Sequence, residues 1–196
     1  MREDQLVPED STQWPSWAVD NVEIVVYDPD WAVRGARERQ RLDMLLAPWR
    51  SRNVEHIGST AVIGLAAKPI VDLQASVASL EVAEGVAAAL TSHHWHYVPP
   101  HLDRRPYRRF FVKIVDGHRA AHLHLMTHNA VRWHQQLAFR DALRANRDLV
   151  RAYSELKFLL AAKHRNNREA YTAGKQKFIN DVLICHMGDG HSGPEN

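Results

Sequence analysis

The chain has 196 residues, of which 45% are hydrophobic, and this is enough for one domain with a sizeable core. Its 25 Lys and Arg residues nearly balance 23 Asp and Glu residues, which argues against a nucleic-acid partner or an anionic membrane surface. Cys185 is the single cysteine, so an intrachain disulfide and a cysteine metal cluster are excluded. Because we find no apolar run of signal-peptide or membrane-spanning length, we expect a cytoplasmic protein with no membrane partner.

The first part of the chain predicts a tail followed by strands and helices. Residues 1–20 are polar, acidic and proline-bearing, which is typical of a flexible tail. Apolar β-branched residues then predict a strand over Val22–Trp31, ended by an Asp-Pro-Asp turn. Apolar residues spaced among Arg and Glu predict an amphipathic helix over Trp31–Leu46, which Pro48 ends.

The stretch from residue 53 to 77 predicts a strand, a turn of small residues and a second strand. The first strand is Val54–Ile57, the turn covers residues 58–64, and the second strand is Pro69–Val77. A helix over Ser79–Leu90, a short strand over His93–Pro99 and a polar loop follow.

Asp116-Gly117 predicts a hairpin turn between the strands at 108–117 and His118–Thr127. Three helices complete the chain: Val131–Ala145, Arg147–His164 and Arg168–His186. Residues 187–196 have a disordered composition. This order predicts the α+β class, with one domain over residues 21–186 that divides into a mixed-sheet part, 21–128, and a helical bundle, 129–186.

The turn at Gly58-Ser59 directly follows a strand and can present backbone N–H groups and a hydroxyl to phosphate oxygens. The spacing to Lys68 is not that of a Walker phosphate loop, and no G-x-G-x-x-G fingerprint is present. His56 and Thr60 flank the turn, and Lys68 can approach a phosphate held there.

Asp72 lies within an apolar strand, where a carboxylate is costly unless it is hydrogen-bonded, paired or bound to a metal. Side chains alternate along a strand, so Gln74 shares the face of Asp72, and His122 shares a face with His124 on the later strand.

The spacing from Gly58-Ser59 to Asp72 resembles the signature of polymerase-beta-like nucleotidyltransferases. The segments VVYDPDW, HIGST, AAKP, RRFFVK and HLHL, with the helical motifs FRDALR, YSELK and REAYTAGKQKFI, resemble the GrpB family over residues 22–183. The resemblance implies a nucleotidyltransferase-like fold in which the Gly-Ser turn holds phosphates and strand acids hold two magnesium ions. It also implies Asp72, His122 and His124 as catalytic and metal-binding residues. Because some relatives are fused behind dephospho-CoA kinase, it implies a partner in coenzyme A biosynthesis.

Gln74 stands where the signature has a second acid, and a neutral amide is a poor magnesium ligand beside carboxylates. One divalent ion (Mg²⁺, Mn²⁺ or Zn²⁺) on an Asp and His set is an alternative to two-metal chemistry, as is a metal-free site with a His as acid or base. Further substrate-binding candidates lie on the later strand and in the helical part, and are Gln74, Arg109, Lys113, Tyr171 and Lys175, with Lys157 weaker.

Three functions remain open. The first is an enzyme that binds a nucleotide or another phosphorylated small molecule and transfers a nucleotidyl group. The second is a non-catalytic binding or regulatory module linked to coenzyme A biosynthesis. The third is a hydrolase or transferase that uses one metal held by the histidines and Asp72.

Overall fold

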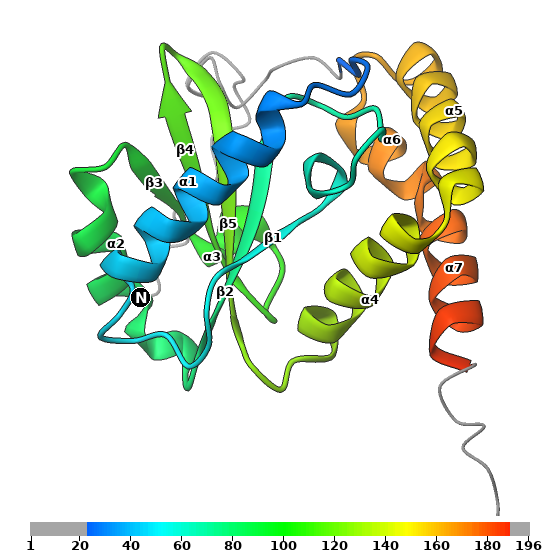
Figure 1. Cartoon of the computed structure of the whole chain (residues 1–196). Coiled ribbons are helices and arrows are strands. Elements are labelled where there is room, and N and C mark those ends of the chain that lie inside the picture. The colour runs from blue at the N-terminus through cyan, green and yellow to red at the C-terminus, as the bar shows by residue number, and fades with distance from the viewer. Residues whose placement is uncertain (1–22, 189–196) are drawn as a thin grey trace, which may run out of the picture.

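The computed structural model describes residues 23–188, which form one mixed β-sheet with helices around it (Figure 1). The strands are β1 (Glu55–Ile57), β2 (Val71–Val77), β3 (Trp95–Val98), β4 (Arg109–Val115) and β5 (His118–Thr127). The helices are α1 (Asp30–Leu45), α2 (Ala83–Thr91), α3 (Pro100–Asp103), α4 (Val131–Ala145), α5 (Arg147–Lys163), α6 (Arg168–Gly174) and α7 (Gln176–Gly188), with 3₁₀ turns η3 (Ser59–Ala61) and η4 (Leu80–Val82).

The strand order in the sheet is β1-β2-β5-β4-β3. β2 and β5 are parallel, and every other neighbouring pair is antiparallel. In the parallel pair Asp72 lies opposite His122 and Gln74 lies opposite His124. Residues opposite one another point to the same face, so the topology puts these four polar side chains together.

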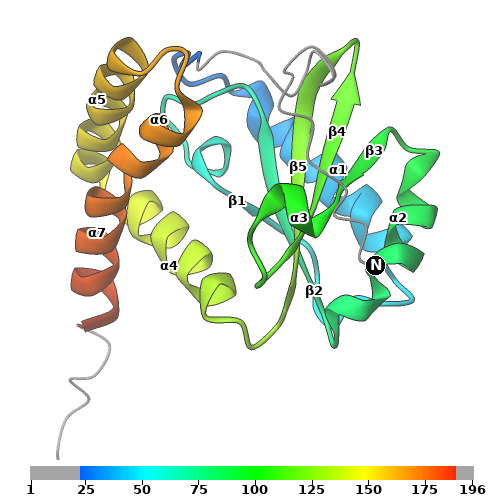
Figure 2. The same ribbon diagram turned by 180° about the vertical axis from the view of Figure 1, so that it is seen from behind.

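The two faces of the sheet are covered differently. Leu73, Leu123 and Phe111 belong to a fully buried cluster shared with residues of α1 and α2, so that face holds the main core. Figure 1 shows α1 crossing it, and Figure 2 shows α3 on the opposite side. The side chains of Asp72, Gln74, His122 and His124 lie on this second face.

Helices α4 to α7 form a separate layer beside the β1 end of the sheet (Figures 1 and 2). Val62 and Leu65, from the segment after β1, pack with Leu143 and Tyr153 in the core of this helical layer. The turn that follows β1 is therefore held between the sheet and the helical bundle.

The predicted hairpin is confirmed. Asp116 and Gly117 both have positive φ, at 51° and 76°, as a tight turn between antiparallel strands requires. The positions of α1, β2, β5, α4 and α5 also agree with the sequence pattern to within a few residues.

Three predicted elements are wrong. Within the described residues, the strand expected over Val22–Trp31 is only an isolated bridge between Val25 and Ala67, and α1 already begins at Asp30. The polar loop after β3 contains the short helix α3. The last helix is two helices, since the N–H of Lys175 bonds to the carbonyl of Thr172, three residues back, where Gly174 weakens the helix.

The predicted tail at 1–20 lies outside the described residues, and so does the predicted tail at 187–196 from residue 189 onward, since α7 reaches Gly188. Within residues 23–188 no helix is both long and apolar enough to span a membrane.

Candidate functional site

The turn after β1 is shaped by Gly58, which has φ 69° and ψ −169°. A Cβ atom at this position would lie 2.7 Å from Oδ2 of Asp72. Glycine is therefore needed both for the backbone conformation and for the close approach of Asp72. The chain then enters η3, which brings Ser59 and Thr60 beside the end of β2.

Lys157 of α5 reaches this turn from the helical layer. Its Nζ donates to Oγ of Ser59 at 3.0 Å and to the carbonyl oxygen of Ala66, and it lies over the ring of Tyr153. Only 2% of Lys157 is exposed. Burial lowers its pKa to about 7, and the charge of Lys175 acts in the same direction.

A small cavity of about 70 Å³, here called the lysine pocket, lies between the turn and the helices. It is lined by Ser59, Thr60, Ala67, Lys68, Ile70, Asp72, Lys157, Tyr171 and Lys175. The ring of Tyr171 lies 5.1 Å from Nζ of Lys68 and 4.4 Å from Nζ of Lys175. The structure thus brings together seven predicted site residues from three distant segments around one polar cavity.

Asp72 is held by the two histidines of β5. Its Oδ1 accepts a hydrogen bond from Nδ1 of His122 at 2.9 Å, and Nε2 of His124 lies 3.8 Å from the same oxygen. The ring of Phe110 packs against both imidazoles. The parallel register of β2 and β5 is the reason that these side chains meet.

Further side-chain contacts extend from His124 to Arg108 and Asp103, away from the lysine pocket. Arg108 contacts Nδ1 of His124, and its Nε and NH2 donate to the two carboxylate oxygens of Asp103 at 2.9 Å and 2.6 Å. A guanidinium cannot accept, so Nδ1 of His124 accepts and the ring proton sits on Nε2, toward Asp72. Arg108 and Asp103 therefore fix the orientation of the second histidine.

The site favours an ionised Asp72 beside a neutral His124. Burial alone would raise the pKa of Asp72, but the hydrogen bonds and charges of His122 and His124 outweigh it and hold the pKa below its usual range. Burial lowers the pKa of His124 to about 4, and the nearby Arg108 adds to this effect against the opposing attraction of Asp72.

Arg109 and Lys113 do not reach this site, so the expectation that they face the Asp72 pocket is wrong. They share the face of Phe111, which is the core face toward α1. Nζ of Lys113 forms an ion pair with Glu38 of α1 at 2.5 Å. The structure places Phe110 and Arg108 toward the histidines instead.

His56 and Gln74 lie next to the site on opposite faces of the sheet. His56 pairs with Leu73 across the strands, so it points to the α1 side, where its Nε2 lies 3.0 Å from Oγ1 of Thr60. Burial lowers the pKa of His56 to about 4. Gln74 is fully buried, and its amide donates to the carbonyl of Trp133 at 3.4 Å, at the start of α4.

The residues do not fit the two-magnesium arrangement of the nucleotidyltransferase signature. Gln74 bonds to the backbone of α4, which leaves Asp72 as the one carboxylate among the described lining residues of the lysine pocket. Asp72 and His122 are hydrogen-bonded to each other, and within residues 23–188 no group of three or more His, Cys, Asp and Glu is arranged to hold an ion. The divalent metal stays a prediction.

Sequence reasoning gave too little weight to Lys157 and missed Arg108. Lys157 does carry a signal, because it continues the buried stripe of Tyr153 and Leu160 at helical spacing. A lysine on such a stripe must find partners inside the protein. Arg108 precedes β4, and nothing in the strand pattern distinguishes it from Arg109.

Comparison with known proteins gives consistent matches over nearly the whole chain. The family model described as GrpB protein matches residues 21–184. A UPF0157 protein of Pseudomonas aeruginosa is 35% identical over 187 residues, covering 89% of this chain and 71% of the relative. The UPF0157 protein YqkA of Bacillus subtilis is 32% identical over 81% of this chain, which spans only 45% of that longer relative.

Among solved structures, the crystal structure of the conserved protein GrpB from Enterococcus faecalis matches with a TM-score of 0.75 at 28% identity. The match covers 85% of this chain and 98% of that one. The α+β class predicted from the element order, with a mixed sheet and helices beside it, is therefore confirmed by both the structure and its neighbour.

Proposed function

The chain belongs to the GrpB family, and on that premise we propose that it binds a nucleotide or another phosphorylated small molecule at the lysine pocket. The observation that carries this proposal is the group of three lysines, Lys68, Lys157 and Lys175, around the Ser59 hydroxyl. Lysine ammonium groups and a hydroxyl at a turn are typical donors to phosphate oxygens.

The size of the pocket indicates which part of the ligand it takes. Its volume of about 70 Å³ is roughly twice the space of one water molecule in the liquid, and far below that of pockets for whole drug-sized ligands. It can hold a group the size of a phosphate. The rest of the ligand would lie outside, along the sheet face toward Asp72 and the histidines.

Lys157 has a particular role in this proposal. Burial keeps its ammonium poorly solvated, so a phosphate in the pocket would supply an opposite charge beside it. Tyr171 would hold the other two lysines in position, because both ammonium groups lie over its ring.

The proposal is tested by calorimetry and thermal unfolding with inorganic pyrophosphate and a set of nucleoside triphosphates, each with and without Mg²⁺ or Mn²⁺. At a hundredfold excess over Kd, a bound ligand adds about 2.7 kcal/mol to the free energy of unfolding. Lys157→Met should abolish this gain. Arg109→Gln, which removes a charge from the opposite sheet face, should keep it. If no compound stabilises the wild type, or if both variants lose binding equally, the proposal is wrong.

A second candidate is transfer of a nucleotidyl group from the bound ligand, favoured by the position of Asp72 in the lining of the pocket. Asp72 is held ionised and oriented by His122, so its charge can stabilise a cation or a donor group of the bound ligand. Release of pyrophosphate from a nucleoside triphosphate, lost in Asp72→Asn while binding persists, would support transfer. Binding without release of pyrophosphate would favour a non-catalytic module, which agrees with the buried Gln74 in place of a second acid. A partner in coenzyme A biosynthesis stays a prediction.

A further inference from the structure

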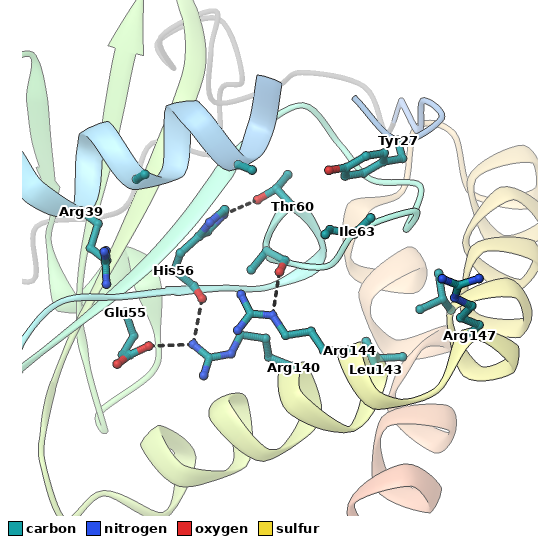
Figure 3. A pocket seen from close by; sticks show the side chains of 14 residues that line it. Tyr27, Arg39, Glu55, His56, Thr60, Ile63, Arg140, Leu143, Arg144 and Arg147 are labelled. Carbon is teal, nitrogen blue, oxygen red and sulfur yellow. Dashed lines mark hydrogen bonds and ion pairs between the residues drawn. The ribbon is translucent and has the colours of Figure 1, made fainter. Parts of the chain in front are cut away.

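A second and much larger cavity lies on the other side of the turn after β1 from the lysine pocket. Its volume is about 670 Å³, within the range of sites for small molecules. Figure 3 shows it between α1, the β1 strand and its turn, α4 and the start of α5. Thr60 lines both cavities, so the turn is the wall between them.

Four arginines line this space, here called the arginine cavity: Arg39, Arg140, Arg144 and Arg147 (Figure 3). The one acidic side chain among its described lining residues is Glu55. Glu55 is already paired with NH1 of Arg140 at 2.7 Å. The cavity therefore keeps a surplus of positive charge.

The surplus positive charge is carried by Arg39, Arg144 and Arg147. Neither Arg39 nor Arg147 has a side-chain hydrogen bond or ion pair with residues 23–188. Arg144 donates through Nε to the carbonyl of Ala61 at 2.9 Å, which fixes its direction while its terminal nitrogens keep further donors. NH1 of Arg144 lies 3.6 Å from Asp141, an exposed contact at the edge of ion-pair range.

The lowered pKa values of Arg144 and His56 agree with a positive electrostatic potential in the arginine cavity. Burial lowers the pKa of Arg144, and repulsion from Arg140 lowers it further. Burial also lowers the pKa of His56 to about 4, and Arg39, Arg140 and Arg144 add to that effect against the opposing attraction of Asp72. An anion in the cavity would relieve this repulsion.

The remaining lining is mostly apolar or aromatic and comes from α1 and the segment before it, the turn, α4 and α5: Tyr27, Ala32, Ala36, Ile63, Leu143 and Val150. Of these, Ile63 is 79% exposed although it is a large aliphatic side chain. A ligand that carries both an oxyanion and an apolar part would cover this surface and satisfy the guanidinium donors.

We infer that the arginine cavity is a second binding site, distinct from the lysine pocket, for a small organic anion. Its carboxylate, phosphate or sulfonate group would be held by Arg144 together with Arg39 or Arg147, which lie at opposite ends of the cavity (Figure 3), and its apolar part would pack on Ile63 and the α1 alanines. This inference does not depend on the ligand of the lysine pocket, because different charged side chains line the two sites.

The test uses the fluorescent anion anilinonaphthalene sulfonate as the probe of the full-length protein, with its affinity measured by fluorescence and calorimetry. The variant is the double substitution Arg39→Gln with Arg147→Gln, since both side chains are exposed and unpaired within residues 23–188, so the fold should be retained. We expect at least about tenfold weaker binding, because charge-assisted hydrogen bonds to the sulfonate are lost.

The matched control removes the same two charges from the same two helices but outside the cavity, as Arg37→Gln with Arg151→Gln. It should bind the probe within about twofold of the wild type, which separates local contacts from net charge. Lys157→Met should also bind normally, which separates this site from the lysine pocket. Equal loss in both double variants, an unchanged affinity in the cavity variant, or no binding by the wild type would overturn the inference.

Discussion

Nζ of Lys157 donates to the hydroxyl of Ser59 across 3.0 Å, although 98 residues separate the two in the chain. Ser59 belongs to the turn after β1 and Lys157 to the third turn of α5, so this bond joins the sheet to the helical layer. Each residue lines the lysine pocket. The pocket therefore exists only when the helices pack against the sheet.

The buried lysine makes stability depend on pH. The unfolded chain keeps the Lys157 proton up to a pKa of 10.5, whereas the folded protein releases it near 7, so the unfolded state binds more protons between these values. The free energy of unfolding should rise by a few kcal/mol from about pH 7 to pH 9.5, at roughly 1.4 kcal/mol per pH unit at most. Lys157→Met should remove most of this rise, as urea unfolding at several pH values will measure.

The control for that experiment is Lys163→Met, on the exposed side of the same helix. It removes a lysine charge without changing a buried group, so the rise in stability with pH should remain. Equal slopes in the wild type and Lys157→Met would show that Lys157 keeps its proton in the folded state at neutral pH.

Binding of a phosphate ligand should be accompanied by proton uptake. At about pH 8 Lys157 is mostly neutral, and a phosphate beside it favours the charged form, so its pKa rises and it takes a proton from the buffer. Calorimetry with pyrophosphate in buffers of different ionisation enthalpy measures the number of protons. Lys175→Gln should weaken binding and reduce the uptake, because loss of its charge lets the pKa of Lys157 rise before the ligand binds. Uptake that is absent in the wild type would contradict a role for Lys157 at the phosphate.

Gly58→Ala should destabilise the protein by more than the cost of its backbone conformation. The left-handed conformation costs an alanine about 1–3 kcal/mol. At Gly58 the added methyl would also meet Asp72, with 2.7 Å to Oδ2 and 3.0 Å to Cβ. Gly117→Ala is the matched control, because its φ is 76° and no atom lies within 4 Å of the added Cβ.

Thermal and urea unfolding of both glycine variants will separate the two costs. We expect the greater loss for Gly58→Ala, together with weaker ligand binding, because Asp72 must move away from the turn. Gly117→Ala should bind ligand normally. Equal destabilisation of the two variants would mean that the turn adapts to the methyl group.

Arg108→Gln should cost about 3 kcal/mol of unfolding free energy, because it leaves Asp103 buried without its main partner. The side chains of Arg108 and Asp103 are only 8% and 4% exposed. Arg105→Gln removes the other arginine of Asp103, which is 47% exposed and 3.4 Å away, and should cost less than about 1 kcal/mol.

The same pair of variants tests whether Arg108 orients His124. In Arg108→Gln the ring of His124 loses its contact at Nδ1, so its pKa should rise as the repulsion from Arg108 disappears. Histidine titration by NMR will measure this change, and Arg105→Gln should leave the titration of His124 as it is in the wild type. An unmoved pKa in Arg108→Gln would mean that burial alone sets it.

Local sequence patterns were sufficient for much of the fold and for part of the site. The Asp116-Gly117 turn, the β4–β5 hairpin and the shared face of His122 and His124 follow from turn chemistry and from strand alternation, which act over a few residues. The turn at Gly58-Ser59 was likewise predicted from a few neighbouring residues, because small residues directly follow a strand there.

Alternation alone did not say which face of β4 holds the core. Arg109 and Lys113 do share one face, but Phe111 buries that face against α1, and Lys113 pairs there with Glu38. A strand with apolar residues on both faces is ambiguous in this respect, since the decision depends on the helix that covers the sheet.

Residue type and short-range backbone geometry are sufficient to predict the strand–turn–strand around Gly58, the carboxylate at Asp72 and the shared face of the two histidines. The packing of distant segments is needed for the rest, because it makes Lys157 and Tyr171 complete the lysine pocket, lets Arg108 orient His124, and places four arginines around a second cavity. Those contacts join segments far apart in the chain. They are fixed by the burial of the helical layer against the β1 end of the sheet, which no local pattern contains.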